Sequence, residues 1–414
     1  MKYGLIGEKL SHSFSKEIHA YLADYIYELC EIARSSLPTF FKKREFSAIN
    51  VTMPYKGEVI PFLDEISPSA KELDAVNVIV KKNGKLYGYN TDYDGLKNMI
   101  LRAKIDVSGK KALILGTGGA ARTAALVLKH LGAREIHLVS RSKIGGVISY
   151  DDMYSRHSDA EIIINATPVG MFPNSYASPI DVSKFHKLSA LFDAVYNPIK
   201  TKLVLDAQEM GAYAEGGLYM LVSQAVRAVE LFLDAEFEAD KTEEIYKKIL
   251  LTKQNIVLIG MPSSGKTTVA ELLSEKLGRK LVDLDDEIEK RIGCTIAEFF
   301  KTHTEKDFRD IETEITKEIS MRNGIIIATG GGCILRHENV KALRSNGRLY
   351  FIDRALENLI PTDSRPLATK REDIERLFEA RYGIYLSVCD VKIDGNIEPR
   401  DEAELITKEF YTLI

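Results

Sequence analysis

The sequence lacks the features of a membrane-spanning, secreted or nucleic-acid-binding protein. No apolar run approaches the roughly 18–20 residues that a bilayer-spanning helix needs. The start, MKYGLIGEKLSHSF, has no basic region followed by a long apolar core, so we expect no signal peptide. Lys and Arg number 56 and Asp and Glu 60, which gives a net charge of −4. Because nucleic acids and anionic membranes bind to basic faces, this balance argues against both as partners.

Cysteine is scarce and tryptophan is absent. The four cysteines, at positions 30, 294, 333 and 389, form no C-x-x-C pair, so their spacing indicates neither a zinc site nor a disulfide framework. We therefore expect reduced thiols and a cytoplasmic protein. With 45% hydrophobic and 28% charged residues, a chain of 414 residues is long enough for roughly two to four globular domains.

Short apolar runs that lead into glycine-rich turns recur along the chain. Such β-branched runs, alternating with helical patterns, indicate parallel sheets built from βαβ units and hence an α/β protein. We also predict an amphipathic helix at about 218–233 and a charged, solvated helix over 234–248, with a domain boundary near 250–254. The three segments that combine a run with a turn are 112–122, 256–267 and 325–332.

One of these turns fits the phosphate-binding pattern G-x-x-x-x-G-K-[ST]. Gly260, Gly265, Lys266 and Thr267 occupy its fixed positions, after an apolar run and before a helical pattern. The glycines let backbone N–H groups converge on phosphate oxygens, and the helix N-terminus adds partial positive charge. Lys266 is expected to reach the β- and γ-phosphates of ATP, and the Thr267 hydroxyl to bind Mg²⁺. The other residues expected to bind ATP are Ser263, Ser264 and Thr268.

Two acidic residues end the next predicted strand, residues 281–285. In a strand, Asp283 and Asp285 point to the same side at the carboxyl end, where parallel sheets bind ligands. One of them could hold Mg²⁺ and the other an acceptor hydroxyl, whereas taken alone such acids are as often surface residues. No N-K-x-D motif is present, which argues against a GTPase.

The second half resembles shikimate kinase over about 255–395, with every motif in order. The motifs are D-L-D-D-E-I-E at 283–289, F-R-D-I-E at 308–312, T-G-G-G at 329–332, S-R-P-L at 364–367 and R-Y-G-I-Y at 381–385. The resemblance implies that Asp283 and Thr267 bind Mg²⁺, and that Asp285 holds the substrate hydroxyl and can take its proton. It also implies that Arg365 reaches from a lid toward the phosphates and acts with Lys266 in catalysis. The residues implied to bind shikimate are Asp285, Arg309, Gly330, Gly331, Gly332 and Arg381.

The first half contains a dinucleotide-binding fingerprint, Gly116-x-Gly118-x-x-Ala121, between a predicted strand and a predicted helix. The next strand, 136–139, ends in the basic turn S-R-S-K at 140–143. An NAD-binding protein would carry Asp or Glu there for the ribose 2′-hydroxyl, whereas hydroxyls and cations suit a 2′-phosphate. We therefore predict NADP(H) over NAD(H), and the alternative is a loop that merely happens to be basic.

The N-terminal part resembles shikimate dehydrogenase over about 1–235. The motifs are S-H-S-F-S at 11–15, N-V-T-M-P-Y-K at 50–56, A-V-N at 75–77, N-T-D at 90–92, N-A-T-P-V-G-M at 165–171, D-A-V-Y at 193–196 and G-L-Y-M-L-V-S-Q at 217–224. The resemblance implies that Lys56 and Asp92 form the catalytic pair. It implies that the residues binding the substrate are Ser13, Ser15, Thr52, Asn77, Tyr196 and Gln224. It implies that the residues binding NADP are Gly116, Gly118, Gly119, Ala120, Ala121, Ser140, Arg141, Ser142, Thr167, Ala194, Gly217 and Met220.

These resemblances together predict an α/β protein of three parts. A substrate domain would comprise residues 1–103 and 218–250, an inserted NADP-binding Rossmann domain 104–217, and a P-loop NTPase-type kinase domain 254–414. The predicted function is bifunctional: NADPH-dependent reduction of 3-dehydroshikimate to shikimate, followed by ATP- and Mg²⁺-dependent phosphorylation of shikimate to shikimate 3-phosphate. Two alternatives stay open, namely oxidation of quinate or shikimate with NAD, and one half that is inactive and serves as a ligand-binding or scaffold module. The partners would be small-molecule substrates, and an oligomer is possible.

Overall fold

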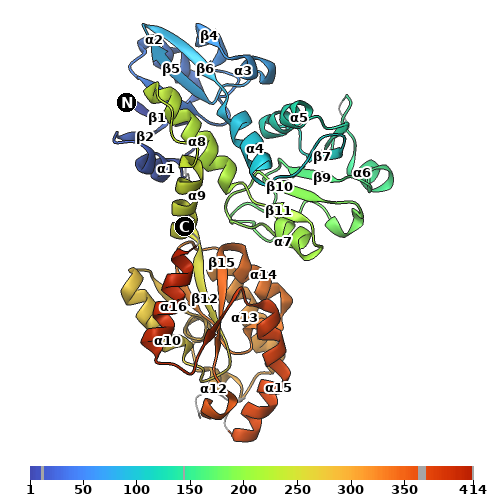
Figure 1. Cartoon of the computed structure of the whole chain (residues 1–414), viewed down its shortest axis with the longest axis vertical. Coiled ribbons are helices and arrows are strands. Elements are labelled where there is room, and N and C mark those ends of the chain that lie inside the picture. The colour runs from blue at the N-terminus through green and yellow to red at the C-terminus, as the bar shows by residue number, and fades with distance from the viewer. Residues whose placement is uncertain (11–13, 143–144, 362–369, 413–414) are drawn as a thin grey trace. The chain divides into compact units, whose positions relative to one another are not determined.

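The structure, a computed structural model, describes residues 1–10, 14–142, 145–361 and 370–412 of the chain. The chain divides into two compact units (Figure 1). The first unit comprises Met1–Met171, Ala177–Asn197 and Leu203–Ile249, and the second comprises Phe172–Tyr176, Pro198–Lys202 and Leu250–Ile414. Helices cover parallel sheets in both units, so the predicted α/β class is confirmed.

The first unit begins with a six-stranded mixed sheet. Its elements are β1 Tyr3–Gly7, α1 Ser15–Leu22, β2 Tyr27–Glu31, α2 Leu37–Lys43, β3 Ala48–Val51, β4 Glu65–Ile66, α3 Pro68–Leu73, β5 Val78–Lys82, β6 Lys85–Tyr89 and α4 Thr91–Arg102. The strand order is β2-β1-β3-β5-β6-β4, and β5 runs antiparallel to both of its neighbours. Ile6, Ile49 and Ile79 from three of these strands pack with Phe41 of α2 in the buried core.

The rest of the first unit is a five-stranded parallel sheet. The elements of this part are β7 Lys111–Leu115, α5 Gly119–His130, β8 Glu135–Val139, α6 Tyr150–Arg156, β9 Ile162–Asn165, β10 Ala190–Asp193, α7 Lys202–Glu209, β11 Tyr213–Glu215, α8 Leu218–Leu233 and α9 Lys241–Lys253. The first residue of α7 and residues 250–253 of α9 fall within the bounds of the second unit. The strand order is β11-β10-β9-β7-β8. Strand β8 lies on one side of β7, and β9, β10 and β11 follow on the other side, so the strand order reverses between β7 and β9. At such a switch point, open α/β sheets bind ligands outside the carboxyl ends of the strands.

Helices α4 and α8 of the first unit pack directly against each other. A side chain at Gly95 of α4 would place its Cβ 2.6 Å from the Met220 carbonyl oxygen and 3.0 Å from the Gln224 Cβ, so the glycine permits this close approach. The predicted amphipathic helix at 218–233 is confirmed as α8. The prediction of a charged helix over 234–248 is wrong for residues 234–240. Asp234 adopts a left-handed conformation (φ 53°) that ends α8, and the next helix begins only at Lys241.

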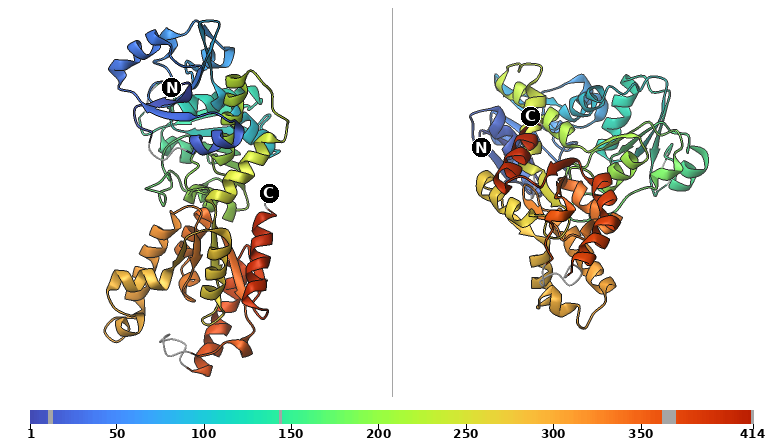
Figure 2. Two further views of the ribbon diagram at one scale, coloured as in Figure 1. Left: turned by 90° about the vertical axis from the view of Figure 1, so that its left-hand side faces the viewer. Right: turned by 60° about the horizontal axis from the view of Figure 1, so that its bottom comes forward.

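The second unit is built on a five-stranded parallel sheet of order β13-β14-β12-β15-β16. Its elements are β12 Asn255–Ile259, α10 Lys266–Leu277, β13 Leu281–Asp283, α11 Leu284–Ile292, α12 Ile296–Phe299, α13 Glu305–Ser320, β14 Ile326–Ala328, α14 His337–Asn346, β15 Gly347–Asp353, α15 Arg371–Val388, β16 Val391–Asp394 and α16 Pro399–Tyr411. Helices cover both faces of this sheet (Figures 1 and 2). Ile256 and Leu258 face α10 and α16, whereas the alternate residues Val257 and Ile259 face α13 and α14.

One strand of the second unit, β13, is shorter than the strand predicted from the sequence. Residues 281–285 were expected to be a strand ending in two acids, but β13 ends at Asp283 and Asp285 lies in the first turn of α11. The physical reason is a helix cap, because the Asp283 side chain accepts a hydrogen bond from the Asp285 backbone N–H at 2.9 Å.

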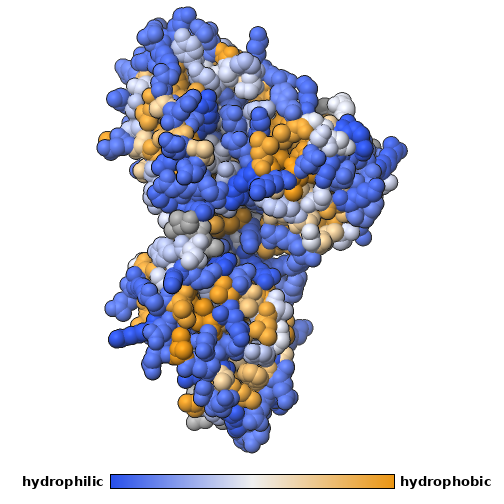
Figure 3. All heavy atoms as spheres, in the orientation of Figure 1, coloured by the Kyte–Doolittle hydropathy of each residue, from blue (hydrophilic) through white to orange (hydrophobic). Residues whose placement is uncertain are grey.

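Polar side chains cover most of one face of the molecule. On the face drawn in Figure 3, hydrophilic residues predominate and apolar ones gather in a few limited groups. Among the residues that the structure describes, no helix combines the length and the apolar character needed to cross a membrane.

Candidate active sites

A cavity of about 210 Å³ in the first unit contains a close ion pair between Lys56 and Asp92. Lys56 Nζ donates to Asp92 Oδ2 at 2.6 Å, and Asn77 Nδ2 donates to Asp92 Oδ1 at 2.9 Å. The carboxylate is therefore held from two sides, with one oxygen for each donor. Both charged side chains remain partly accessible, Lys56 at 27% and Asp92 at 20%, so a ligand in the cavity can reach them.

The local sequence explains why Asp92 sits at this point. Asn90 caps α4, since its Oδ1 accepts hydrogen bonds from the backbone N–H groups of Asp92 (3.1 Å) and Tyr93 (3.3 Å). Asp92 thus lies in the first helical turn, where the helix dipole stabilises negative charge. Asn77 Oδ1 also accepts from the Thr91 backbone N–H at 2.7 Å, which ties the start of the helix to the strand that follows Asn77.

The other substrate-binding residues predicted for this half gather around the same cavity. Burial raises the pKa of the Tyr196 hydroxyl, so this group stays protonated and can donate a hydrogen bond. Ser13 and its neighbour His12 lie outside the described residues. The predicted residues that line the cavity are Ser15, Thr52, Asn77, Tyr196 and Gln224, together with Ala194, Gly217 and Met220 from the NADP set.

Several residues that line this cavity were not predicted from the sequence: Leu5, His19, Asn50, Val51 and Leu221. Asn50 and Val51 open the segment N-V-T-M-P-Y-K, which was the available signal for them. His19 is 1% exposed, and burial lowers its pKa to about 3. Its Nδ1 lies 2.7 Å from the Tyr25 hydroxyl, so it serves as a neutral imidazole in the wall of the cavity.

The predicted NADP-binding residues lie along the carboxyl edge of the five-stranded sheet of the first unit. Gly116 follows β7 with φ 111°, and a Cβ there would approach the Ala166 carbonyl oxygen to 3.2 Å, so only glycine fits without strain. Around Gly118 and Gly119 the space is open within 4 Å of an added Cβ, which lets a ligand approach the backbone. Ala120 is exposed at the start of α5, and Ala121 is buried beneath it.

Two further turns at the same edge follow β8 and β9. After β8, the Ser140 hydroxyl accepts a hydrogen bond from the Ser142 backbone N–H at 3.2 Å, and Arg141 between them is exposed. After β9, the backbone N–H and the hydroxyl of Thr167 both donate to Asn165 Oδ1, at 3.0 and 2.7 Å. Hydroxyl groups and one cation are therefore presented to solvent where a dinucleotide would pass.

A second cavity, of about 360 Å³, lies in the second unit against the phosphate-binding loop. The loop takes the left-handed backbone that its glycines allow, with φ 155° at Gly260 and 93° at Gly265. Lys266 is almost fully buried, and its Nζ donates to the Gly260 and Met261 carbonyl oxygens at 3.0 and 2.8 Å. The predicted ATP-site residues that line the cavity are Ser263, Gly265, Lys266, Thr267 and Thr268, whereas Gly260 and the fully buried Ser264 do not line it.

The predicted magnesium ligands are neighbours in this second cavity. The Thr267 hydroxyl donates to Asp283 Oδ2 at 3.0 Å. A hydroxyl and a carboxylate side by side next to a phosphate-binding loop match the oxygen ligands that Mg²⁺ prefers, so these residues fit the ion. Asp285 lines the same cavity, and its Oδ1 lies 2.6 Å from where a Cβ on Gly330 would stand, so a side chain at Gly330 would displace this carboxylate.

Two buried arginines also line the second cavity. Arg309 and Arg381 are 8% and 5% exposed. Arg309 donates to Glu312 at 2.8 Å and to Glu305 at 3.2 Å, and Arg381 Nη1 donates to the Gly331 carbonyl oxygen at 2.9 Å. Burial by itself would lower the pKa of Arg309, but the neighbouring glutamates outweigh it and raise that pKa. A carboxylate entering the cavity would meet two cations already held in place.

The carboxylate partner of Arg309 and the apolar residues that line the second cavity were not predicted from the sequence. Glu312 is 1% exposed; burial raises its pKa, and the Arg309 guanidinium opposes that change. The sequence signal available for Glu312 was its spacing of three residues from Arg309 within F-R-D-I-E, which puts both side chains on one face of α13. The missed apolar residues of this cavity are Ile296, Phe300, Phe308 and Leu377. Arg365 and most of the predicted lid, residues 362–369, lie outside the described residues.

Comparison with known proteins identifies both halves. The sequence model of the shikimate kinase family matches residues 262–411, and that of the shikimate dehydrogenase substrate binding domain matches residues 5–79. The shikimate dehydrogenase (NADP(+)) of Clostridium perfringens is 37% identical over an alignment of 265 residues, with coverage of 60% of this chain and 97% of that protein.

Solved structures agree with this match. Shikimate dehydrogenase 1 from Peptoclostridium difficile is 37% identical, with coverage of 60% of this chain and 98% of that chain and a TM-score of 0.55. The Thermus thermophilus enzyme, solved in complex with NADP(H) and shikimate, is 28% identical, with coverage of 60% and 99% and a TM-score of 0.54. The chain therefore belongs to the shikimate dehydrogenase family, and its second half carries a shikimate kinase domain.

Proposed function

We propose that the chain catalyses two consecutive reactions, the NADPH-dependent reduction of 3-dehydroshikimate to shikimate and the ATP- and Mg²⁺-dependent phosphorylation of shikimate to shikimate 3-phosphate. The observation that carries the proposal is the pairing of two different cavities in one polypeptide. One cavity holds the Lys56–Asp92 pair and the other holds Lys266 beside two buried arginines. The product of the first reaction is the substrate of the second.

In the first reaction, Lys56 and Asp92 act on the ketone oxygen. NADPH, when bound, supplies the hydride that attacks the carbonyl carbon. The Lys56 ammonium stabilises the negative charge that develops on the oxygen and donates a proton to it. Asp92 keeps this ammonium oriented through the 2.6 Å contact, and Asn77 keeps Asp92 in place. Ser15, Thr52 and Gln224 then hold the ring through its carboxylate and hydroxyls.

The basic turn argues for NADPH rather than NADH. Arg141 is exposed between Ser140 and Ser142 at the end of β8, and no acidic residue stands in this turn at 140–142 to hold a ribose 2′-hydroxyl. Arg and serine hydroxyls donate hydrogen bonds to phosphate oxygens. The residues present therefore fit a 2′-phosphate.

In the second reaction, ATP supplies the γ-phosphoryl group, and Mg²⁺ neutralises charge on the phosphates. Arg309 and Arg381 grip the shikimate carboxylate, which fixes the ring in the cavity. Asp285 accepts the proton of the attacking hydroxyl. The hydroxyl oxygen bonds to the γ-phosphorus while the bond to the β-phosphate oxygen breaks, and Lys266 stabilises the charge that accumulates there.

The test is one mixture of 3-dehydroshikimate, NADPH, ATP and Mg²⁺, with the product identified by mass. We expect shikimate 3-phosphate from the unmodified chain. Lys266→Ala should stop at shikimate, since one preorganised donor to a developing charge is worth roughly 10²–10³ in rate. Lys56→Ala should form no product from 3-dehydroshikimate but should still phosphorylate added shikimate. If the unmodified chain stops at shikimate, the kinase half is a ligand-binding or scaffold module and the proposal is wrong in that part.

A further inference from the structure

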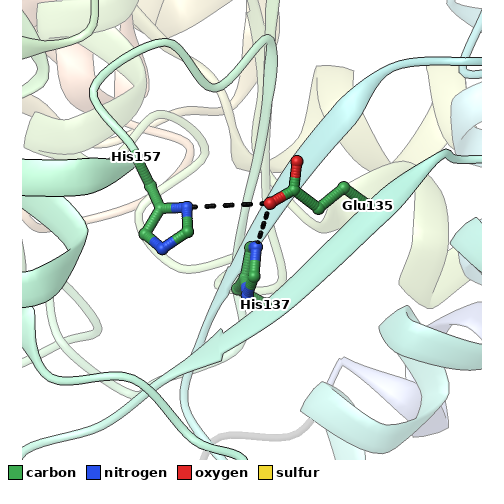
Figure 4. Close-up of side chains that lie close together, drawn as sticks. All are labelled: Glu135, His137 and His157. Carbon is green, nitrogen blue, oxygen red and sulfur yellow. Dashed lines mark hydrogen bonds and ion pairs between the residues drawn. The ribbon is translucent and has the colours of Figure 1, made fainter.

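A group of three side chains in the first unit lies apart from both cavities. Glu135 and His137 are two residues apart on the edge strand β8, so they point to the same face of the sheet. His157, which follows the last residue of α6, faces them from the other side (Figure 4). Two imidazoles and one carboxylate therefore converge between a strand and a helix end.

The donor atoms are close enough to share one ion. His137 Nε2 lies 2.6 Å and His157 Nδ1 lies 3.9 Å from the same carboxylate oxygen, Glu135 Oε1. All three donor atoms lie within 4.8 Å of one another. In a tetrahedral site with bonds of about 2.0–2.1 Å, two ligand atoms stand about 3.4 Å apart. Side-chain shifts of less than about 1 Å would bring each of the two measured separations to that value.

The chemistry of the three groups suits a metal. His157 Nδ1 is buried and has no hydrogen-bond partner, which is unusual for a ring nitrogen next to a carboxylate. An imidazole nitrogen without a hydrogen-bond partner can offer its lone pair to a metal ion. The Glu135 carboxylate adds an oxygen ligand to the two imidazoles.

One cation faces the group and has its own partner. Lys111, the register neighbour of Glu135 on β7, has its Nζ 3.7 Å from Glu135 Oε1 and 2.8 Å from Asp159 Oδ1. The ammonium is therefore bonded first to Asp159, and Glu135 stays available to a second positive charge. With neutral imidazoles, the group carries no net positive charge, because the two carboxylates, Glu135 and Asp159, outnumber the one ammonium, Lys111.

We propose that Glu135, His137 and His157 form a site for one divalent transition metal of the zinc class. Imidazole ligands select Zn²⁺, Ni²⁺ or Cu²⁺ over Mg²⁺ and Ca²⁺, which prefer oxygen. Two histidines and one glutamate supply three ligands, and water would supply the fourth. The ion would join β8 to the end of α6. His137 is three residues before Ser140, about 10 Å along the strand, so the ion would stabilise the fold without touching the cofactor turn.

The test measures zinc uptake by the full chain, dialysed against ZnCl₂ with excess Mg²⁺ to occupy the oxygen sites. His157→Ala and Glu135→Gln should each bind about one zinc ion less per chain than the unmodified protein. The matched control is His186→Ala, which removes an exposed histidine of the same unit and should change nothing. Zinc should also raise the Tm of the unmodified protein and of His186→Ala, but not that of the other two variants.

An X-ray anomalous signal at the zinc edge should locate the ion between the three side chains. The KM for NADPH should not depend on zinc, because the ion stands away from the cofactor turn. Equal zinc uptake by all four proteins would overturn the proposal, as would an anomalous peak on the cysteines alone. If His157→Ala and Glu135→Gln retain their reductase activity, misfolding is excluded as the cause of the lost zinc ion.

Discussion

Replacing Asp92 with asparagine tests the catalytic role of the Lys56–Asp92 pair. The two carboxylate oxygens accept from two different donors, Oδ2 from Lys56 Nζ at 2.6 Å and Oδ1 from Asn77 Nδ2 at 2.9 Å. An amide has one acceptor and one donor at these positions. In either orientation, Asp92→Asn therefore sets its NH₂ group against another donor. Lys56 loses its ionic partner in both orientations; in one of them it also loses its hydrogen-bond acceptor, and in the other Asn77 loses its acceptor.

The magnitude follows from the bond that is lost. A hydrogen bond to a charged group contributes about 1.5–3 kcal/mol. At 1.36 kcal/mol for each tenfold change in rate, this corresponds to a fall of roughly 10- to 150-fold in kcat/KM for the reduction of 3-dehydroshikimate. The pair is only a fifth to a quarter exposed, so solvent screening reduces this range little.

The assay follows NADPH consumption at several 3-dehydroshikimate concentrations. Asp94→Asn is the matched control, because Asp94 lies in the same first turn of α4 and its loss weakens the helix N-terminus equally. Phosphorylation of shikimate by the same preparation should stay unchanged. A fall in kcat/KM of less than about threefold, or one equal to that of Asp94→Asn, would refute the assigned role of Asp92.

Three further changes test the cofactor turn, the cavity wall and the arginine pocket. Arg141→Ala should raise the KM for NADPH about 10-fold or more and leave that for NADH unchanged, because only NADPH carries the 2′-phosphate; steady-state kinetics with both cofactors measure this. Burial lowers the pKa of His19 to about 3, so its contribution to stability is complete above pH 6.5, the pKa of an unfolded histidine, and is lost as pH falls toward 3. Urea unfolding at about pH 7 and about pH 5.5 should therefore show a loss of about 1 kcal/mol that His19→Gln abolishes. Gly332→Ala would put a Cβ into the Arg309 guanidinium, so the KM for shikimate in the kinase assay should rise about 10-fold while the reductase is unaffected.

Each of these three predictions has a result that would contradict it. Equal effects of Arg141→Ala on both cofactors would mean that the basic turn does not read the 2′-phosphate. An unchanged pH dependence in His19→Gln would mean that the buried imidazole does not take up a proton on unfolding. An unchanged KM for shikimate in Gly332→Ala would mean that Arg309 does not hold the substrate.

Much of the fold was predictable because local chemistry dictates it. The spacing of Gly260, Gly265 and Lys266 requires a strand, a left-handed turn and a helix in that order, and β12 and α10 have this arrangement. The apolar periodicity of residues 218–233 likewise matched α8. The errors arose where a side chain bonded to the backbone. Asp283 caps a helix that begins at Leu284, one residue before the predicted strand ends, and Asp234 stops a helix that its charged neighbours could have continued.

The candidate sites were predictable only where a motif held the residues together. Lys56 and Asp92 are 36 residues apart and could be paired only through a family resemblance, since their contact depends on the sheet and on the Asn90 cap. Glu312 stood three residues from Arg309, but its burial depends on tertiary packing. His137 and His157 gave no signal, because a strand and a helix end meet only after the chain has turned.

The contact between α4 and α8 at Gly95 determines a separation that matters for catalysis. Asp92 begins the first of these helices, and Met220 and Gln224 belong to the second. Because an added Cβ at Gly95 would stand 2.6 Å from the Met220 carbonyl oxygen, the two helices are in close contact there and act as a spacer between the proposed proton-transfer pair and Met220, one of the predicted NADP-binding residues. A methyl group at this one buried position would wedge the spacer open, lengthening the hydride path without altering any group that reacts.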